Sequence, residues 1–188
     1  AALRCPAGAL HRLYPKLDLP IGAFRNRHDA TFEEVTSVWG LDRPGVNQGL
    51  ALADFDGDGA TDIALVRQPH VLGRLELWSF RGGLLQKIAE VPDVSTHAIG
   101  SRALGMSAVA DFDGDGRPDL AVPSLDRRAL RLIAFAPRPR EIVRVALPSR
   151  AATDFGMVMR RGRVALIAEL ENGALVLLHD GSRAAGSR

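Results

Sequence analysis

Eight carboxylates stand in two short stretches of this sequence with the same spacing. The stretches read ADFDGDGATDIALV and ADFDGDGRPDLAVP, and they hold eight of the fifteen aspartates in the 188-residue chain. Counted from the first aspartate of each stretch, the carboxylates fall at positions 1, 3, 5 and 9, with glycines at positions 4 and 6. Alternate side chains of a tightly turned loop can converge on one point, because glycine permits the positive φ angles of such a turn. The spacing therefore predicts two cation sites.

The ligand types predict calcium as the cation. Calcium takes about six to eight oxygen ligands in irregular geometry, whereas magnesium requires a stricter octahedron. Zinc prefers histidine or cysteine, and neither stretch contains one. As in the EF-hand loop, the residue at position 7 would contribute its backbone carbonyl. We therefore expect two calcium ions, one held by Asp54, Asp56, Asp58, Ala60 and Asp62, the other by Asp111, Asp113, Asp115, Arg117 and Asp119.

The two loops share their chemistry with EF-hands but not the surrounding structure. Position 12, where an EF-hand has a bidentate glutamate, is Leu65 in one loop and Val122 in the other. The residues after position 9 also favour strands, where an EF-hand continues as a helix. Without that glutamate we expect dissociation constants around 10⁻⁴–10⁻³ M, the range of extracellular modules. The prediction for localisation is therefore extracytoplasmic: periplasmic, cell-surface or secreted.

A repeat of about 56 residues surrounds these loops. Each unit contains a run before the loop, DIALV or DLAVP after it, and two further apolar runs. Alternation in LELWSF, LRLIAF and IVRVAL predicts half-buried strands. Four strands per repeat indicate an all-β chain of antiparallel propeller blades. The predicted parts are residues 1–47 (an N-terminal segment whose residues 8–20 could be outer strands of a preceding blade), 48–92 and 93–149 (blades with calcium loops) and 150–188 (a degenerate blade).

The degenerate third unit predicts an incomplete propeller. RVALIAEL and ALVLL resemble strands of the second unit, but residues 157–168 contain no carboxylate and RRGR replaces the aspartate loop. We expect this blade to keep its strands without a calcium site. Closed propellers have about four to eight blades. Closure would therefore need the remaining blades of a larger propeller, or a partner chain.

The two aspartate stretches resemble the calcium loops of FG-GAP repeats, also called VCBS repeats. FEEVTSVWGLDRPGVNQGLALAD resembles the segment that often precedes such a loop in bacterial members. These repeats build the propellers of integrin alpha subunits and of many exported bacterial proteins. The resemblance covers residues 31 to about 135 well and 150–179 weakly. It implies that each loop joins the first and second strands of a blade and binds one calcium ion.

Composition limits the remaining function classes. Although 22 of the 24 basic residues are arginine, they are scattered without interleaved aromatic residues, so we expect no nucleic-acid binding. No apolar run approaches the roughly 20 residues of a membrane span. No catalytic constellation is recognisable, so the prediction is a non-enzymatic binding or adhesion module for a protein or carbohydrate ligand, with calcium in a structural role. The alternatives are an accessory or catalytic propeller domain of an exported polysaccharide-acting enzyme, and a structural spacer.

Overall fold

The computed structural model describes residues 22–40, 47–160, 163–179 and 182–186. All regular elements among these residues are β-strands, and no helix there is long and apolar enough to cross a membrane. The chain divides into two compact units, Ala1–Asn47 with Phe80–Gln86, and Gln48–Ser79 with Lys87–Arg188. The outer strands predicted for residues 8–20 lie outside the described residues.

The first unit contains a short antiparallel hairpin of β1 (Phe24–Asn26) and β2 (Phe32–Glu34). The Ala23 carbonyl accepts a hydrogen bond from the Val35 N–H, so the pairing continues beyond the strands. A turn follows in which Trp39 packs edge-on against Phe80, with 4.6 Å between the ring centroids. That contact packs the turn against the Phe80–Gln86 segment of the same unit.

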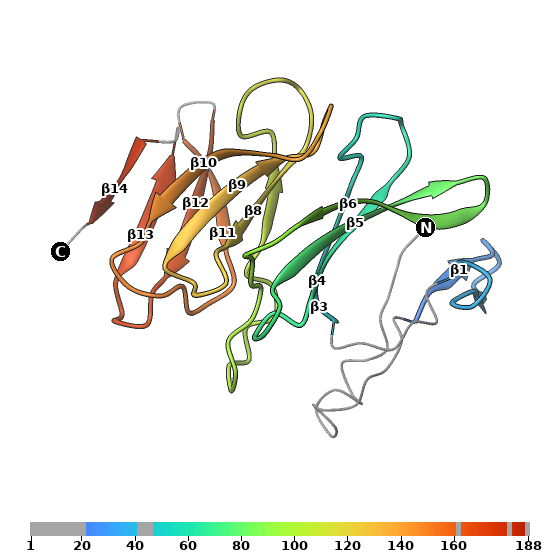
Figure 1. Cartoon of the computed structure of the whole chain (residues 1–188), viewed down its shortest axis with the longest axis horizontal. Coiled ribbons are helices and arrows are strands. Elements are labelled where there is room, and N and C mark those ends of the chain that lie inside the picture. The colour runs from blue at the N-terminus through green and yellow to red at the C-terminus, as the bar shows by residue number, and fades with distance from the viewer. Residues whose placement is uncertain (1–21, 41–46, 161–162, 180–181, 187–188) are drawn as a thin grey trace. The chain divides into compact units, whose positions relative to one another are not determined.

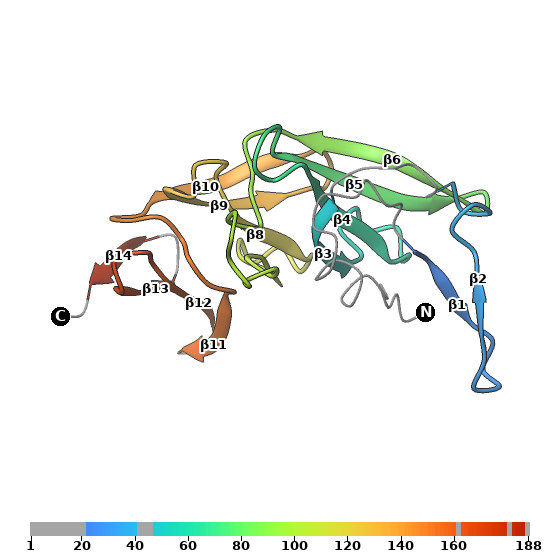
Figure 2. The same cartoon turned by 90° about the horizontal axis from the view of Figure 1, so that it is seen from below.

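Three four-stranded sheets make up the rest of the fold (Figures 1 and 2). They are β3 (Asn47–Ala53), β4 (Asp62–Arg67), β5 (Arg74–Arg81) and β6 (Leu84–Val91); β7 (Ala108–Ala110), β8 (Asp119–Pro123), β9 (Ala129–Ala134) and β10 (Arg140–Ala146); and β11 (Gly156–Arg160), β12 (Arg163–Glu169), β13 (Leu175–His179) and β14 (Ser182–Gly186). In each sheet the strands lie in sequence order. The central pairs β4–β5, β8–β9 and β12–β13 are antiparallel. Sequential four-stranded sheets of this kind are propeller blades, so the predicted all-β propeller class is confirmed.

Two apolar cores hold these sheets together within the second unit. The first joins β4 and β5 to β8 and β9, and in it the rings of Phe55 and Phe135 lie 5.2 Å apart. The second joins the second sheet to the third and includes Met106, Leu130 and Leu166. Strand β8 is buried on both faces because the second sheet lies between the two cores, and β4 is also buried along nearly its whole length. Their nearly continuous apolar sequences follow from that burial.

The expectation of half-buried strands is wrong for β5 and β9. Glu76 on β5 and Arg131 on β9 are the polar members of the alternating pattern, yet they are only 4% and 7% exposed. Glu76 accepts a hydrogen bond from the indole of Trp78 at 3.1 Å and lies 3.4 Å from the Lys87 ammonium group. A charged side chain can be buried when such partners replace its water. The polar positions of the alternating pattern in these strands can therefore be buried ion-paired side chains, and not only solvent-exposed ones.

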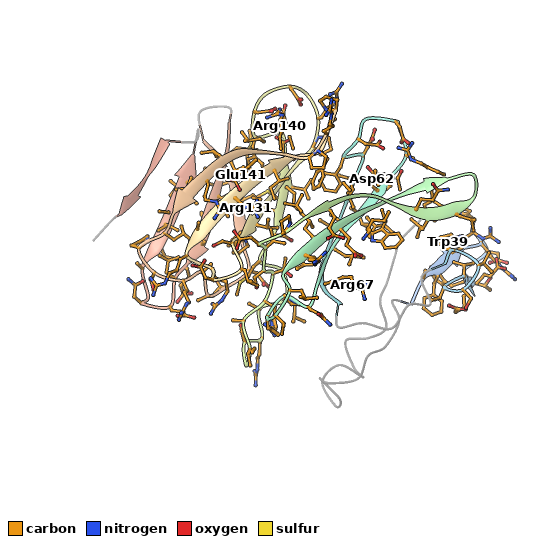
Figure 3. The ribbon with its side chains drawn as sticks, in the orientation of Figure 1. Trp39, Asp62, Arg67, Arg131, Arg140 and Glu141 are labelled. Carbon is orange, nitrogen blue, oxygen red and sulfur yellow. The ribbon has the colours of Figure 1, made fainter. Side chains whose placement is uncertain are left out.

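Arg131 ties the second sheet to the segment that leads into it. Its Nη1 donates to the carbonyl oxygens of Pro92 and Asp93 at 2.5 and 2.8 Å, and its Nε donates to the Glu141 carboxylate (Figure 3). Arg131→Met keeps the apolar stem but removes the buried guanidinium that donates to the Pro92 and Asp93 carbonyls and to the Glu141 carboxylate. We expect the free energy of unfolding in urea to fall by about 2–3 kcal/mol.

Arg144→Met is the matched control for this prediction. Arg144 pairs with the same Asp93 and Glu141, but its side chain is 44% exposed. Exposed ion pairs contribute about 0.2–1 kcal/mol, so the control should lose no more than that. Equal losses in the two variants would contradict a special role for the buried guanidinium.

Candidate metal centre

The two aspartate loops connect the first and second strands of their sheets. The first runs between β3 and β4 and the second between β7 and β8, and both lie at the same end of their sheets (Figure 1). The phenylalanine of each loop packs into an apolar core: Phe55 is fully buried in the first core, and Phe112 packs against the second. These apolar anchors hold polar loops in place at the end of the blades.

The glycines give both loops the same backbone path. Gly57 and Gly59 have φ angles of 80° and 86°, a left-handed conformation that side chains other than glycine rarely adopt. Their N–H groups donate to the two carboxylate oxygens of Asp54 at 2.8 and 2.9 Å. Gly114 and Gly116 bind Asp111 in the same way at 2.7 and 2.9 Å. Each loop is thus wrapped around its first aspartate.

Three of the predicted aspartates converge in each loop. One carboxylate oxygen from each of Asp54, Asp56 and Asp62 lies within 4.8 Å of the others, and so do oxygens of Asp111, Asp113 and Asp115. Convergence of this kind can hold a metal ion, and the oxygen ligands suit calcium. The predicted ligands Asp58 and Asp119 stand outside these sets of side-chain ligands. The ligands predicted at Ala60 and Arg117 are backbone carbonyls, which these sets do not include.

Local hydrogen bonds from backbone N–H groups engage the carboxylates of Asp58, Asp115 and Asp119. Oδ1 of Asp58 accepts the Ala60 N–H at 2.8 Å, and Oδ1 of Asp115 accepts the Arg117 N–H at 2.9 Å. Asp119 accepts the Phe112 N–H at 2.9 Å through Oδ2. These bonds shape the loop ends where the predicted carbonyl ligands stand.

Asp62 fits a cation ligand best among the described residues. It is fully buried, and its Oδ2 accepts the N–H groups of Phe55 and Asp56 at 2.9 and 3.2 Å. Its Oδ1 is buried without a hydrogen-bond partner. Burial raises the pKa of Asp62, and the nearby Ser79 hydroxyl lowers it in part. That hydroxyl is also buried and makes no hydrogen bond of good geometry. A buried oxygen with an unused lone pair is what a hard cation requires.

The electrostatics of both loops also favour a cation. Burial raises the pKa of the Asp62 carboxyl above its ordinary value, and burial raises the pKa of Asp119 to about 6. In each case a neighbouring aspartate adds to the rise: Asp56 for the first, Asp113 and then Asp115 for the second. A bound divalent cation would reverse both effects, because it stabilises the ionised carboxylates.

Two arginines take part in this site in ways that the sequence analysis missed. Arg140, at the start of β10, pairs with the predicted ligand Asp113, Nη2 to Oδ2 at 2.5 Å. Arg117 was predicted to act through its carbonyl, yet its side chain also lies over the first loop. A β-carbon on Gly57 would meet its Nε at 3.3 Å. Both contacts span long stretches of sequence, so no local pattern signals them.

Comparison with known families agrees with this geometry. Residues 54–122, from the first aspartate of the first loop to strand β8, match the family model described as an FG-GAP-like repeat. Residues 54–122 are therefore similar to an FG-GAP-like repeat. The matched segment includes both aspartate loops, and the predicted resemblance is confirmed for it. A search of curated proteins found none that matches the chain.

The third sheet differs from the first two sheets at the position of the aspartate loop. Strands β11 and β12 pair up to Arg160 and Arg163, where the other sheets have an aspartate loop between their first two strands. Residues 161–162 lie outside the described part of the chain. Among the residues that the structure describes, the third sheet contributes no cluster of metal-binding side chains.

Proposed function

We propose that this chain is a calcium-binding propeller module with no enzymatic activity, in which calcium stabilises the blades. The observation that carries the proposal is the unpartnered Oδ1 of Asp62, buried beside Asp54 and Asp56. Three carboxylates within 4.8 Å repel one another unless a cation neutralises them. The FG-GAP-like match at residues 54–122 supports the same interpretation.

We further propose that the module works outside the cytoplasm and recognises a protein or carbohydrate ligand. Leu65 stands where an EF-hand has its bidentate glutamate, which favours weak sites that fill only at extracellular calcium concentrations. Ligand recognition is assigned to the loops at the ends of the blades, because loops on a rigid scaffold commonly carry binding residues.

The propeller is proposed to be completed by further blades or by a partner chain. The described residues form three four-stranded sheets, whereas closed propellers have about four to eight. The third sheet exposes large apolar side chains, with Met157, Met159 and Leu175 each more than half exposed. Burying them against another blade would remove apolar surface from water.

Calorimetric titration with calcium chloride tests the site assignment. We expect saturable binding with dissociation constants near 10⁻⁴–10⁻³ M. Asp62→Asn keeps the shape of the side chain but removes its charge, so the first loop should bind calcium at least about tenfold more weakly, a loss of about 1.4 kcal/mol. A micromolar or tighter constant would contradict the proposed extracytoplasmic role.

Asp126→Asn is the control for the loss of one negative charge. Asp126 lies in the β8–β9 connection and accepts a hydrogen bond from the Ser124 hydroxyl, outside both aspartate loops. Its substitution should leave calcium binding unchanged. The site assignment fails if the unsubstituted chain shows no saturable binding, or if the Asp62 and Asp126 variants bind calcium equally well.

A further inference from the structure

Two buried side-chain oxygens lack a hydrogen-bond partner among the residues that the structure describes, and both belong to the first sheet. They are Oδ1 of Asp62 on β4 and Oγ of Ser79 on β5, and both residues are fully buried. A buried polar atom has lost its water, so one without a partner calls for a structural or functional reason. For Asp62 that reason is the proposed calcium ion. Ser79 belongs to no predicted set of ligands.

The register of β4 and β5 brings Ser79 and Asp62 together. Ile63 pairs with Trp78 in this antiparallel ladder, so one step further along the same register Asp62 stands opposite Ser79. Side chains opposite each other project from the same face of a sheet, with their β-carbons about 4.5–5.5 Å apart. Burial raises the pKa of the Asp62 carboxyl, and the Ser79 hydroxyl is the largest cause that lowers it. The hydroxyl is therefore close enough to act on this carboxylate.

The aspartate loop holds the Asp62 carboxylate from its other side. Asp62 begins β4 where the loop ends (Figure 3), and its Oδ2 accepts the N–H groups of Phe55 and Asp56 at 2.9 and 3.2 Å. These bonds fix one oxygen of the carboxylate to the loop backbone. A serine hydroxyl carries one hydrogen to donate. A bond from β5 would fix the carboxylate from the strand side as well and would favour its ionised form.

We infer that Ser79 is a positioning residue of the first calcium site, whose hydroxyl donates to the Asp62 carboxylate and holds it in the orientation that binds the ion. The inference rests on the proposed calcium function. A carboxylate offers about four lone-pair sites on its two oxygens, so it can serve a cation and several donors together. Hydrogen-bond partners behind a metal ligand raise metal affinity without contacting the metal.

The second sheet indicates that alanine is compatible with this position of a blade. Leu120 pairs with Ile133, so Asp119 stands opposite Ala134, the counterpart of Ser79. Ala134 is buried in its strand, as Ser79 is. We therefore expect Ser79→Ala to fold. Because the substitution removes a buried hydroxyl that lacks a partner, it should not destabilise the chain in chelator.

Calorimetry on the full chain with the second site disabled tests this inference. In an Asp113→Ala background, the calcium signal reports the first loop. Adding Ser79→Ala should raise the dissociation constant for calcium by about tenfold, the lower end of the effect of such partners on metal affinity. The melting temperature in chelator should stay the same or rise, and the gain from chelator to calcium should become smaller. A serine with only a structural role would change both melting temperatures equally.

Ser124→Ala in the same background is the matched control. Ser124 is also buried, and its hydroxyl donates to Asp126 at 2.6 Å in the β8–β9 connection, outside both aspartate loops. Its loss should lower the melting temperature equally in chelator and in calcium and leave the dissociation constant unchanged. If Ser79→Ala binds calcium as tightly as the background chain, the inference is overturned and the proposed function stands. If the unsubstituted chain shows no saturable binding, the proposed function itself fails, so the two failures are distinguishable.

Discussion

Chelation of calcium should lower the melting temperature of this protein by about 5–11 °C for each site that calcium fills. Calcium at one hundred times its dissociation constant contributes about 2.7 kcal/mol per site. For a chain of this length, each kcal/mol corresponds to about 2–4 °C. The physical reason is that removal of the ion leaves three converging carboxylates within 4.8 Å of one another in each loop. Differential scanning calorimetry in chelator and in calcium at about one hundred times the dissociation constant found by titration measures the difference.

Single-site variants divide this effect between the loops. Asp56→Ala and Asp113→Ala should each remove one loop's share of the calcium-dependent gain, and the double variant should lose nearly all of it. Magnesium at the same concentration should stabilise the chain less, because it requires a stricter octahedron and keeps more of its water. Equal melting temperatures in chelator and in that concentration of calcium would mean that the loops are ordinary turns.

Gly73→Ala should cost about 2–5 kcal/mol of unfolding free energy. A β-carbon at residue 73 would lie 2.4 Å from the Val94 carbonyl oxygen and 2.6 Å from Cδ1 of Leu125. The Gly73 φ angle of 53° adds about 1–2 kcal/mol of backbone strain for alanine, and overpacking costs a further 1–3 kcal/mol or more. This position joins the β4–β5 turn to the β8–β9 connection, so the clash separates two blades. Urea unfolding measures the loss.

Gly173→Ala separates strain from steric clash. Gly173 has a φ angle of 78°, but a β-carbon there would meet no atom within 4 Å. Only the backbone strain remains, so we expect a loss of about 1–2 kcal/mol. Similar losses at positions 73 and 173 would show that the close approach of the two blades is unimportant for stability.

The loop geometry could be predicted because its determinants are local. Asp54 to Asp62 span nine positions, and the glycines at 57 and 59 dictate how the chain turns between them. The hydrogen bonds to Asp54 connect residues three and five positions apart. Such short-range geometry depends on residue type and spacing, and the second loop repeats it with the same residue types.

The long-range contacts of Arg140 and Arg131 could not be predicted in this way. Arg140 and Asp113 are 27 positions apart, and nothing in the RPRE segment identifies its partner. The burial of Arg131 depends on carbonyls 39 and 38 positions earlier in the chain. Alternation made the Arg131 position appear exposed, because a pattern records polarity and not the ion pairs that permit burial.

The sequence by itself determined the strand repeat, the propeller class and the position of both aspartate loops. Those properties follow from residue order within one repeat, where backbone geometry links neighbours in the chain. Only the tertiary structure decided which carboxylates converge, that Oδ1 of Asp62 is left without a partner, and that Arg140 neutralises part of the second loop. The physical reason is that burial and ion pairing depend on atoms brought together by packing between strands and between blades, and the spacing of residues along the chain does not specify that packing.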